Sequence, residues 1–285
     1  MLDLNEIPGA KSGGRLAGKV ALIVGAGSSA SGWSNGSAVA ALFAREGAAV
    51  AAVDVSADAA EEVREAIVRA GGRCIALVAD GTKKDEIARA VAQCVAEFGR
   101  VDILHNNMGG SIPSKVLDST EADWRFVLDR NLTAALFASQ CVLPVMVKQG
   151  NGSIIHISSN AAVAYPRLNM VSYSAAKAGL HALSRAVAME YVTAGIRSNC
   201  IILGHIDTPE IRRRALERFG ADKLEEVMTA RASIIPMKRV GTVWEVAHAA
   251  VYFASDESGF VTGAEFIMDG GTSIPVVESY PDKVK

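Results

Sequence analysis

A tyrosine and a lysine four residues apart form the pair of side chains best suited to catalysis. Tyr173 and Lys177 stand at the start of a predicted helix, where this spacing places them on one face. A free phenol has a pKa near 10 and is a poor base at neutral pH, but a neighbouring ammonium favours the phenolate. Ser159, just after an apolar run, would add a hydroxyl. The three residues predict proton transfer at a substrate oxygen, whereas a Tyr–Lys pair alone is usually a surface coincidence.

A segment rich in glycine and serine, from Gly25 to Gly36, is suited to phosphate binding. It follows an apolar run and precedes small residues typical of a helix. Glycines let the backbone approach a phosphate closely, and the amino end of a helix favours negative charge. We therefore predict that Gly25, Ser34, Asn35 and Gly36 bind the phosphates of a dinucleotide. A flexible loop is the alternative, because glycine-rich patterns alone are weak.

Two acidic residues follow the next apolar runs. Asp54 lies 18 residues after Gly36, about where an acidic side chain accepts hydrogen bonds from the adenosine ribose of NAD. A solvated aspartate at a strand end is the alternative. Asp80 is interpreted either as an adenine contact or as a helix cap. Because the loop between Gly25 and Gly36 holds no basic residue that could pair with the extra phosphate of NADP, we predict NAD as the cofactor.

Short apolar runs alternate with helix-period runs along nearly the whole chain. Seven runs predict strands, at residues 20–24, 49–53, 74–79, 101–106, 153–158, 196–202 and 264–268. They are continuously apolar, as in a parallel sheet covered on both faces. Helical patterns lie between them, including residues 58–70, 120–147 and 173–194. The sequence therefore predicts an α/β fold, a Rossmann-like doubly wound parallel sheet of seven strands with helices on both faces.

We expect one dinucleotide-binding catalytic domain at residues 18–271, preceded by a loose N-terminal arm at 1–17 and followed by a C-terminal extension at 272–285. A charged helical segment at 208–236 is longer than a plain crossover needs, and we predict that it is a mobile lid. Its arginines Arg212, Arg213 and Arg214 could hold an acidic substrate, although a charge run on a helix is more often a solvated face.

The composition argues against several classes of function. With 29 basic and 31 acidic residues among 285, and a formal net charge of −2, the chain lacks the field that would hold nucleic acid or an anionic membrane. No apolar run approaches the ~18 residues of a membrane span, and the first residues lack the pattern of a signal peptide. The four cysteines are far apart, and the five histidines suggest no metal site. We therefore expect a cytoplasmic protein without a metal.

Taken together, the motifs resemble the short-chain dehydrogenases/reductases in their compact single-domain form, over residues 15–272. The similar segments are Leu16-Ala17-Gly18-Lys19-Val20, Asn106-Asn107-Met108-Gly109, Asn131-Leu132, Ser159, the pair Tyr173 and Lys177, residues 199–208, Pro236 with Arg239 and Gly241, Val261-Thr262-Gly263 and Asp269-Gly270-Gly271.

The resemblance implies an NAD(H)-dependent oxidoreductase that interconverts a secondary alcohol and a ketone by hydride transfer, with Tyr173 as general acid and base. It implies catalytic roles for Asn131, Ser159, Tyr173 and Lys177, with Asn131 holding a water that links Lys177 to solvent. The implied cofactor-binding residues are Gly25, Ser34, Asn35, Gly36, Asp54, Asp80, Gly81, Asn107, Gly109, Tyr173, Lys177, Gly204, Ile206 and Thr208, and the implied substrate-binding residues are Ser159, Asn160, Tyr173 and His205. It also implies a homotetramer or a homodimer, joined through helices 120–147 and 173–194.

Three departures from the family pattern affect these assignments. The phosphate loop is longer than G-x-x-x-G-x-G, with Ser34 where the middle glycine would fall, and Leu203 replaces the proline before Gly204. The spacing from Ser159 to Tyr173 is one residue longer than usual, so Ser158 is the alternative hydroxyl donor. The alternative functions are a non-catalytic NAD-binding sensor of the same fold and an NADP-dependent carbonyl or oxoacyl reductase.

Overall fold

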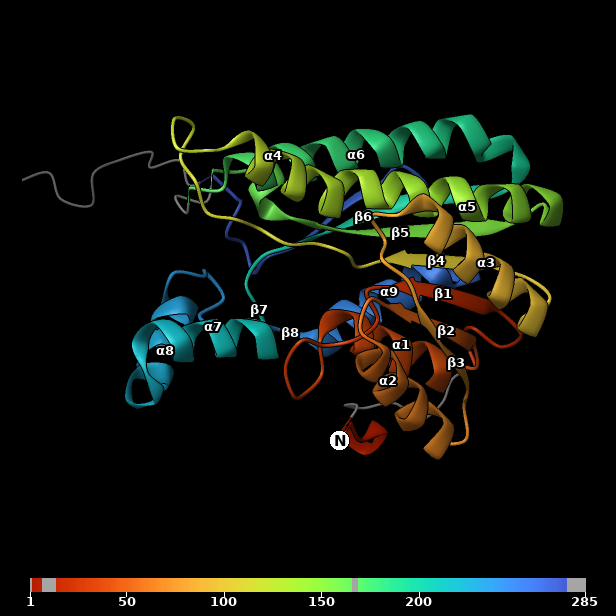
Figure 1. The fold of residues 1–285 in the computed structure, drawn as a ribbon, viewed down its shortest axis with the longest axis horizontal. Coiled ribbons are helices and arrows are strands. Elements are labelled where there is room, and N and C mark those ends of the chain that lie inside the picture. The colour runs from red at the N-terminus through yellow and green to blue at the C-terminus, as the bar shows by residue number, and fades with distance from the viewer. Residues whose placement is uncertain (1, 7–13, 166–168, 276–285) are drawn as a thin grey trace, which may run out of the picture.

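The computed structural model describes residues 2–6, 14–165 and 169–275, and its centre is a parallel sheet of seven strands (Figure 1). The strands lie in the order β3-β2-β1-β4-β5-β6-β9. Their bounds are β1 Val20–Val24, β2 Ala49–Asp54, β3 Arg73–Val78, β4 Ile103–Asn106, β5 Gly152–Ser159, β6 Ile196–Leu203 and β9 Glu265–Met268. The order changes direction between β1 and β4, which is where ligands bind in such sheets. The predicted doubly wound sheet is confirmed.

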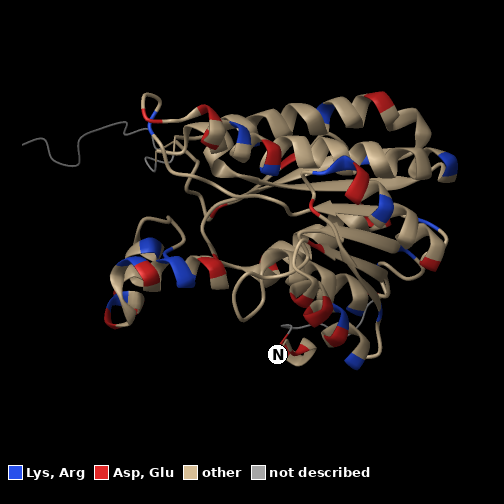
Figure 2. Ribbon diagram, in the orientation of Figure 1, with Lys and Arg blue, Asp and Glu red and all other residues tan. Residues whose placement is uncertain are grey.

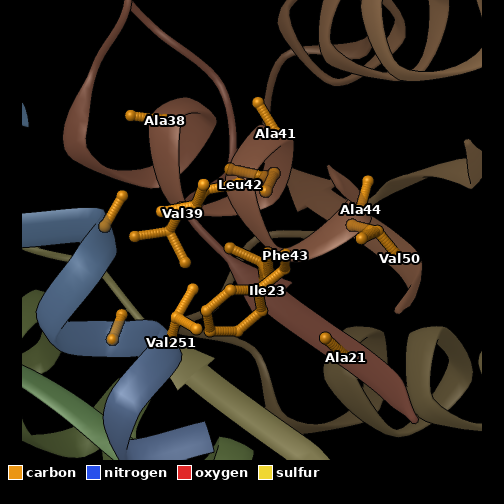
Figure 3. Packing of buried hydrophobic residues seen from close by; sticks show 14 of the residues in the cluster. Ala21, Ile23, Ala38, Val39, Ala41, Leu42, Phe43, Ala44, Val50 and Val251 are labelled. Carbon is orange, nitrogen blue, oxygen red and sulfur yellow. The ribbon is translucent and has the colours of Figure 1, made fainter. Parts of the chain in front are cut away.

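Helices cover both faces of this sheet (Figure 1). Their bounds are α1 Asn35–Arg45, α2 Ala57–Arg69, α3 Lys84–Phe98, α5 Ala134–Gln149, α6 Val171–Tyr191 and α9 Val243–Ala254. One face packs against α1, α2 and α9, and the other packs against α3, α5 and α6. On the first face, Phe43, Ile23 and Val251 pack in one cluster that excludes solvent (Figure 3). Burial on both faces explains why the strands are continuously apolar.

The predicted strand bounds agree with the observed ones within two residues, and those of β1 are identical. The largest difference is in β4, which starts at Ile103 instead of residue 101. The Asp102 side chain there accepts a hydrogen bond from the Val20 N–H (2.9 Å) and pairs with Arg100. These residues therefore anchor the start of the strand and do not extend it.

The predicted helix at 120–147 is interrupted by one π-helical turn. It consists of α4 Glu121–Leu128, the π turn Asp129–Thr133 and α5, and the side chain of Thr120 caps it by accepting a hydrogen bond from the Asp123 N–H (3.1 Å). By length and by a mean hydropathy of 1.3, Glu121–Gln149 could cross a membrane. The same apolar character is explained by α5, whose inner face is buried against the sheet and α3.

The segment at 208–236 forms two charged helices that stand apart from the sheet (Figures 1 and 2). These are α7 Pro209–Phe219 and α8 Leu224–Ser233, which contact each other, and their buried residues are Ala215 and Met228. A two-stranded sheet, β7 Ile206–Asp207 and β8 Gly241–Thr242, flanks them. The helices agree with the sequence analysis, and the mobility of the segment stays a prediction.

The described residues of the N-terminal arm pack against the domain instead of lying loose. Leu2 and Leu16 are buried in the cluster around α1. The indole N–H of Trp33 donates to the carboxylate of Glu6 (2.7 Å), and Arg15 forms an ion pair with Glu257. The prediction of a loose arm missed these contacts because the arm has one proline, three glycines and no apolar period, while Leu2 and Leu16 are far apart in the sequence.

Candidate active site

Tyr173 and Ser159 meet at the carboxyl end of β5. Tyr173 lies in the first turn of α6, and Ser159 is the last residue of β5. The Ser159 hydroxyl stands where it can donate a hydrogen bond to the Tyr173 phenolate. Burial raises the pKa of the Tyr173 phenol, while the bond to Ser159 and the charge of Arg214 lower it. The phenol therefore has a hydrogen-bond donor available to its charged form, as a group that gains and loses a proton requires.

Lys177 lies one helical turn after Tyr173 and is buried. Its ammonium donates to the carbonyl of Ile157 (2.9 Å) and lies 5.6 Å from the centroid of the Tyr173 ring. Burial lowers the pKa of Lys177 to about 8. The role of Lys177 in lowering the pKa of the phenol stays a prediction, and its ammonium lies close enough to the ring to take that role.

Asn131 projects from the π turn toward Lys177. Its amide N–H group donates to the carbonyls of Val127 (2.8 Å) and Gly110 (2.7 Å), while its Oδ1 is buried without a partner among the described residues. A Cβ on Gly109 would lie 3.1 Å from this Oδ1 and 3.6 Å from the Lys177 Nζ. Gly109 therefore keeps the space between Asn131 and Lys177 open. The amide both satisfies backbone groups and leaves an acceptor for a water.

Ser158 faces away from this site. Its hydroxyl forms a 2.7 Å hydrogen bond with Nε2 of His181, and the other ring nitrogen of His181 lies 3.2 Å from Glu265. Both Ser158 and His181 are buried. Because successive side chains of a strand point to opposite faces, only Ser159 meets the Tyr173 hydroxyl. The structure thus supports Ser159 over Ser158 as the hydroxyl donor.

A cleft of about 550 Å³ lies at the carboxyl ends of β1, β2 and β4. The predicted cofactor residues that line it are Gly25, Ser34, Asp54, Asp80, Gly81, Asn107, Gly109 and Thr208. Gly25 has a φ of +80°, and a Cβ there would lie 3.3 Å from the Asn107 backbone, so only glycine fits without strain. The volume of the cleft and the glycine backbone that lines it fit a dinucleotide at the switch point of the sheet.

The loop that follows Gly25 is closed by its own hydrogen bonds. The hydroxyl of Ser34 donates to the Gly27 carbonyl (2.8 Å) and caps α1 by accepting from the Ser37 N–H (3.1 Å). Gly36 is buried, and a Cβ there would lie only 2.0 Å from the Gly25 carbonyl oxygen. Asn35 keeps a buried Oδ1 without a partner among the described residues. Ser34 and Gly36 therefore shape the loop and dock α1 closely on β1.

Asp54 faces the same cleft from the end of β2. Its two carboxylate oxygens accept hydrogen bonds from the N–H groups of Gly27 (2.9 Å) and Ser56 (3.1 Å). Asp80 instead caps its own turn, because its carboxylate accepts from the N–H (2.9 Å) and the hydroxyl (2.7 Å) of Thr82. The capping interpretation of Asp80 fits these contacts, although Asp80 still lines the cleft. Gly81 lies directly against the thioether of Met108, where a Cβ would stand 1.8 Å from the sulfur.

The residues after β6 are divided between two cavities. Thr208 lines the cofactor cleft and caps α7 by accepting from the Ile211 N–H (3.3 Å). His205 and Ile206 line a different cavity of about 640 Å³, where Nδ1 of His205 lies 3.1 Å from Arg231.

Gly204 lies close to Asp269. Asn160 opens a short turn directly after Ser159. The predicted substrate contacts are thus separated, with Asn160 beside Ser159 and His205 in the other cavity.

Two charged residues of the cleft were missed by the sequence analysis. Arg130 lines it, and its charge contributes to a lowered pKa of Asp80. Glu210, in the first turn of α7, also lines it and accepts a hydrogen bond from the hydroxyl of Ser29 (2.9 Å). Arg130 could have been inferred from its place next to Asn131. Glu210 gave no local signal, because its position depends on how α7 packs.

Comparisons with known proteins agree with this geometry. Residues 29–273 match a family described as enoyl-(acyl carrier protein) reductase. Dehydrogenase/reductase SDR family member 6 of Xenopus laevis is 39% identical over 261 residues, which cover 92% of this chain and 100% of that protein. The 2,5-dichloro-2,5-cyclohexadiene-1,4-diol dehydrogenase LinX of Sphingobium indicum is 35% identical, with coverage of 92% and 99%.

A solved structure from Burkholderia xenovorans, described as a short-chain dehydrogenase/reductase, has the same fold. It superimposes with a TM-score of 0.87 at 40% identity, covering 92% of this chain and 99% of that one. The similarity therefore extends over the sheet, its helices and both sides of the cleft.

Proposed function

We propose, on the premise that the chain belongs to the short-chain dehydrogenase/reductase family, that it interconverts a secondary alcohol and a ketone with NAD(H). The chain is an oxidoreductase of a family that uses nicotinamide cofactors. The observation that carries the proposal is that Tyr173, Ser159, Lys177 and Asn131 gather at one edge of the sheet, beside a cleft with the dimensions of a dinucleotide. A non-catalytic sensor would have no use for this set.

The chemistry divides between the bound cofactor and the side chains of the protein. A bound nicotinamide would accept or supply the hydride at the carbinol carbon. In oxidation, the Tyr173 phenolate takes the hydroxyl proton, and in reduction the phenol donates it back. Ser159 donates a hydrogen bond that holds the substrate oxygen. Lys177 binds ribose hydroxyls, and a water between Asn131 and Lys177 carries the proton to solvent.

The preference for NAD rests on Asp54. Its carboxylate faces the cleft and is held by two backbone N–H groups, so it stays ready to accept hydrogen bonds from ribose hydroxyls. The same carboxylate would repel the 2′-phosphate of NADP. Among the described residues, Arg130 is the basic side chain that lines the cleft, and its charge acts on Asp80. Neither Gly27 nor Ser56, the partners of Asp54, could neutralise a phosphate.

The experiment compares NADH with NADPH in the reduction of a panel of ketones. We expect kcat/KM to be at least tens-fold higher with NADH, because charge-assisted hydrogen bonds are worth about 1.5–3 kcal/mol. Asp54→Ala should lower kcat/KM with NADH and bring the ratio of the NADH value to the NADPH value closer to one. Asp58→Ala, in the first turn of α2, should leave this ratio unchanged. Equal use of the two cofactors by the wild-type enzyme would contradict the role of Asp54.

The substrate class is supported by a relative. The Sphingobium enzyme is named as the dehydrogenase of a cyclic diol, so a hydroxyl on a ring carbon is compatible with a similar site. We further propose a cytoplasmic homotetramer joined through α4, α5 and α6, without nucleic acid or membrane partners. Its support is the exposed apolar residues on these helices, among them Trp124, Leu136 and Met189.

A further inference from the structure

The lengthened phosphate loop between β1 and α1 contacts the amino end of α7. The hydroxyl of Ser29 donates to the carboxylate of Glu210 (2.9 Å), although the two residues are 181 positions apart in the sequence. Further along the loop, Gly32 lies against Pro209. A Cβ on Gly32 would stand 3.1 Å from the Cγ of Pro209, and its φ of +113° favours glycine. The loop and α7 therefore meet at a hydrogen bond and at a close backbone approach.

This contact separates two cavities. Ser29 lines the cofactor cleft from the loop, and Thr208, Pro209 and Glu210 line it from α7. On the other side of the contact, Ser31 lines a cavity of about 450 Å³ together with Thr208 and Pro209. The loop and the start of α7 thus form a common wall of the cofactor cleft. A dinucleotide in the cleft would be enclosed on this side while the wall stays intact.

Glu210 is held in position for this contact by two arginines of α7. Arg213 donates two hydrogen bonds to its carboxylate (3.0 and 2.8 Å), and Nε of Arg214 donates a third (2.7 Å). The hydrogen bonds from Arg213 lower the pKa of Glu210 to about 2, so the carboxylate is charged at neutral pH. A hydrogen bond from Ser29 to a charged acceptor is stronger than one to a neutral acceptor. Glu210 therefore needs no rearrangement to accept it.

We propose that Ser29 and Glu210 form a latch that holds α7 over the bound cofactor and slows its release. The inference rests on the proposed function for the identity of that cofactor. Both are positioning residues, because they act through α7 and not on the reacting atoms. The latch also fixes Thr208, which caps α7 by accepting from the Ile211 N–H (3.3 Å) and lines the same cleft.

The test measures how fast NADH leaves the protein. In a stopped-flow instrument, the fluorescence of protein-bound NADH is followed after mixing with excess NAD⁺. We expect Ser29→Ala to raise the dissociation rate about 5- to 20-fold, because a charge-assisted hydrogen bond is lost at a partly exposed site. The association rate should change by less than about twofold, because contacts made after encounter act mainly on dissociation.

Two further variants of the loop serve as controls. Ser29→Thr keeps a hydroxyl and should release NADH at nearly the wild-type rate. Ser31→Ala makes the same substitution in the same loop, at a hydroxyl that has no hydrogen-bond partner among the described residues, and should leave the rate unchanged. An unchanged rate in Ser29→Ala, or an equal increase in Ser31→Ala, would overturn the inference.

A double-mutant cycle tests whether the two residues act as a pair. Glu210→Ala should also raise the dissociation rate, and adding Ser29→Ala to it should raise the rate no further. Effects that multiply in the double variant would show that Ser29 and Glu210 act independently, and would overturn the latch.

Hydrogen exchange in α7 separates the latch from the proposed function. Without any cofactor, the amides of α7 should exchange faster in Ser29→Ala than in the wild type and in Ser31→Ala. Equal exchange in the three proteins would overturn the latch, whatever the cofactor is. A wild-type protein that binds NADPH and not NADH would contradict the proposed cofactor alone, and the release of NADPH would then test the latch in the same way.

Discussion

At the scale of single residues, Ser158 and Ser159 are adjacent in sequence but have opposite surroundings. The Ser159 hydroxyl faces the Tyr173 phenol, whereas the buried Ser158 hydroxyl forms a hydrogen bond with Nε2 of His181. Ser159→Ala should lower kcat by ~10-fold or more with little change in stability, because it removes a donor from the substrate oxygen. Ser158→Ala should keep kcat but lower the free energy of unfolding by about 1–3 kcal/mol, because His181 loses a buried partner. A larger loss of kcat in Ser158→Ala would reverse the assignment.

Lys177 is needed for the proposed chemistry, but the burial of its ammonium should lower the stability of the fold. The folded protein releases the Lys177 proton near pH 8, whereas the unfolded chain holds it until about pH 10.5. Burial of the ammonium therefore destabilises the fold below pH 8, by up to about 3 kcal/mol, and this cost disappears as the pH rises toward 10.5. Lys177→Met should be inactive yet more stable than the wild type at neutral pH.

Urea unfolding of the wild type and Lys177→Met, at about pH 7 and about pH 10, measures this difference. We expect the advantage of the variant to shrink at the higher pH. An advantage that is constant across the two pH values would show that the ammonium carries no burial cost, and that any gain comes from packing alone.

At the scale of elements, the strands and most helices were predictable because their patterns are local. A run such as Val20–Val24 is apolar on both faces, and the helical pattern at 120–147 begins where the Thr120 side chain caps α4. The π turn Asp129–Thr133 was not predictable, because a single additional residue in a turn leaves the apolar spacing nearly unchanged. That turn nevertheless carries Asn131, a poor helix former in mid-helix.

The parts of the site that the sequence analysis missed depend on packing between distant elements. Tyr173, Lys177, Ser159 and Asp54 were identified because each lies at a recognisable strand end or helix start. Glu210 reaches the cleft only through the way α7 lies against the phosphate loop, and no pattern in the sequence specifies that contact. His205 was expected beside the substrate; its Nδ1 lies 3.1 Å from Arg231, and its contact with substrate stays a prediction.

At the scale of the whole molecule, exposed apolar side chains support the proposed assembly. Trp124, Leu136 and Met189 are 37%, 36% and 72% exposed on α4, α5 and α6. Exposed apolar surface of this kind is typical of interfaces between subunits. Sedimentation equilibrium at micromolar concentration should give a homotetramer, and Met189→Glu together with Leu136→Glu should dissociate it. A wild-type protein that sediments as a monomer would contradict the proposal.

The most direct test of the account concerns the Tyr173 hydroxyl, on which the proposed chemistry depends. Tyr173→Phe removes one oxygen and keeps the ring that packs near Lys177. NADH oxidation should be followed at 340 nm over the same panel of ketones, with NADH binding measured on both proteins. We expect turnover to fall by at least ~100-fold while the Kd for NADH is unchanged. Turnover by Tyr173→Phe within a few-fold of the wild type would contradict it.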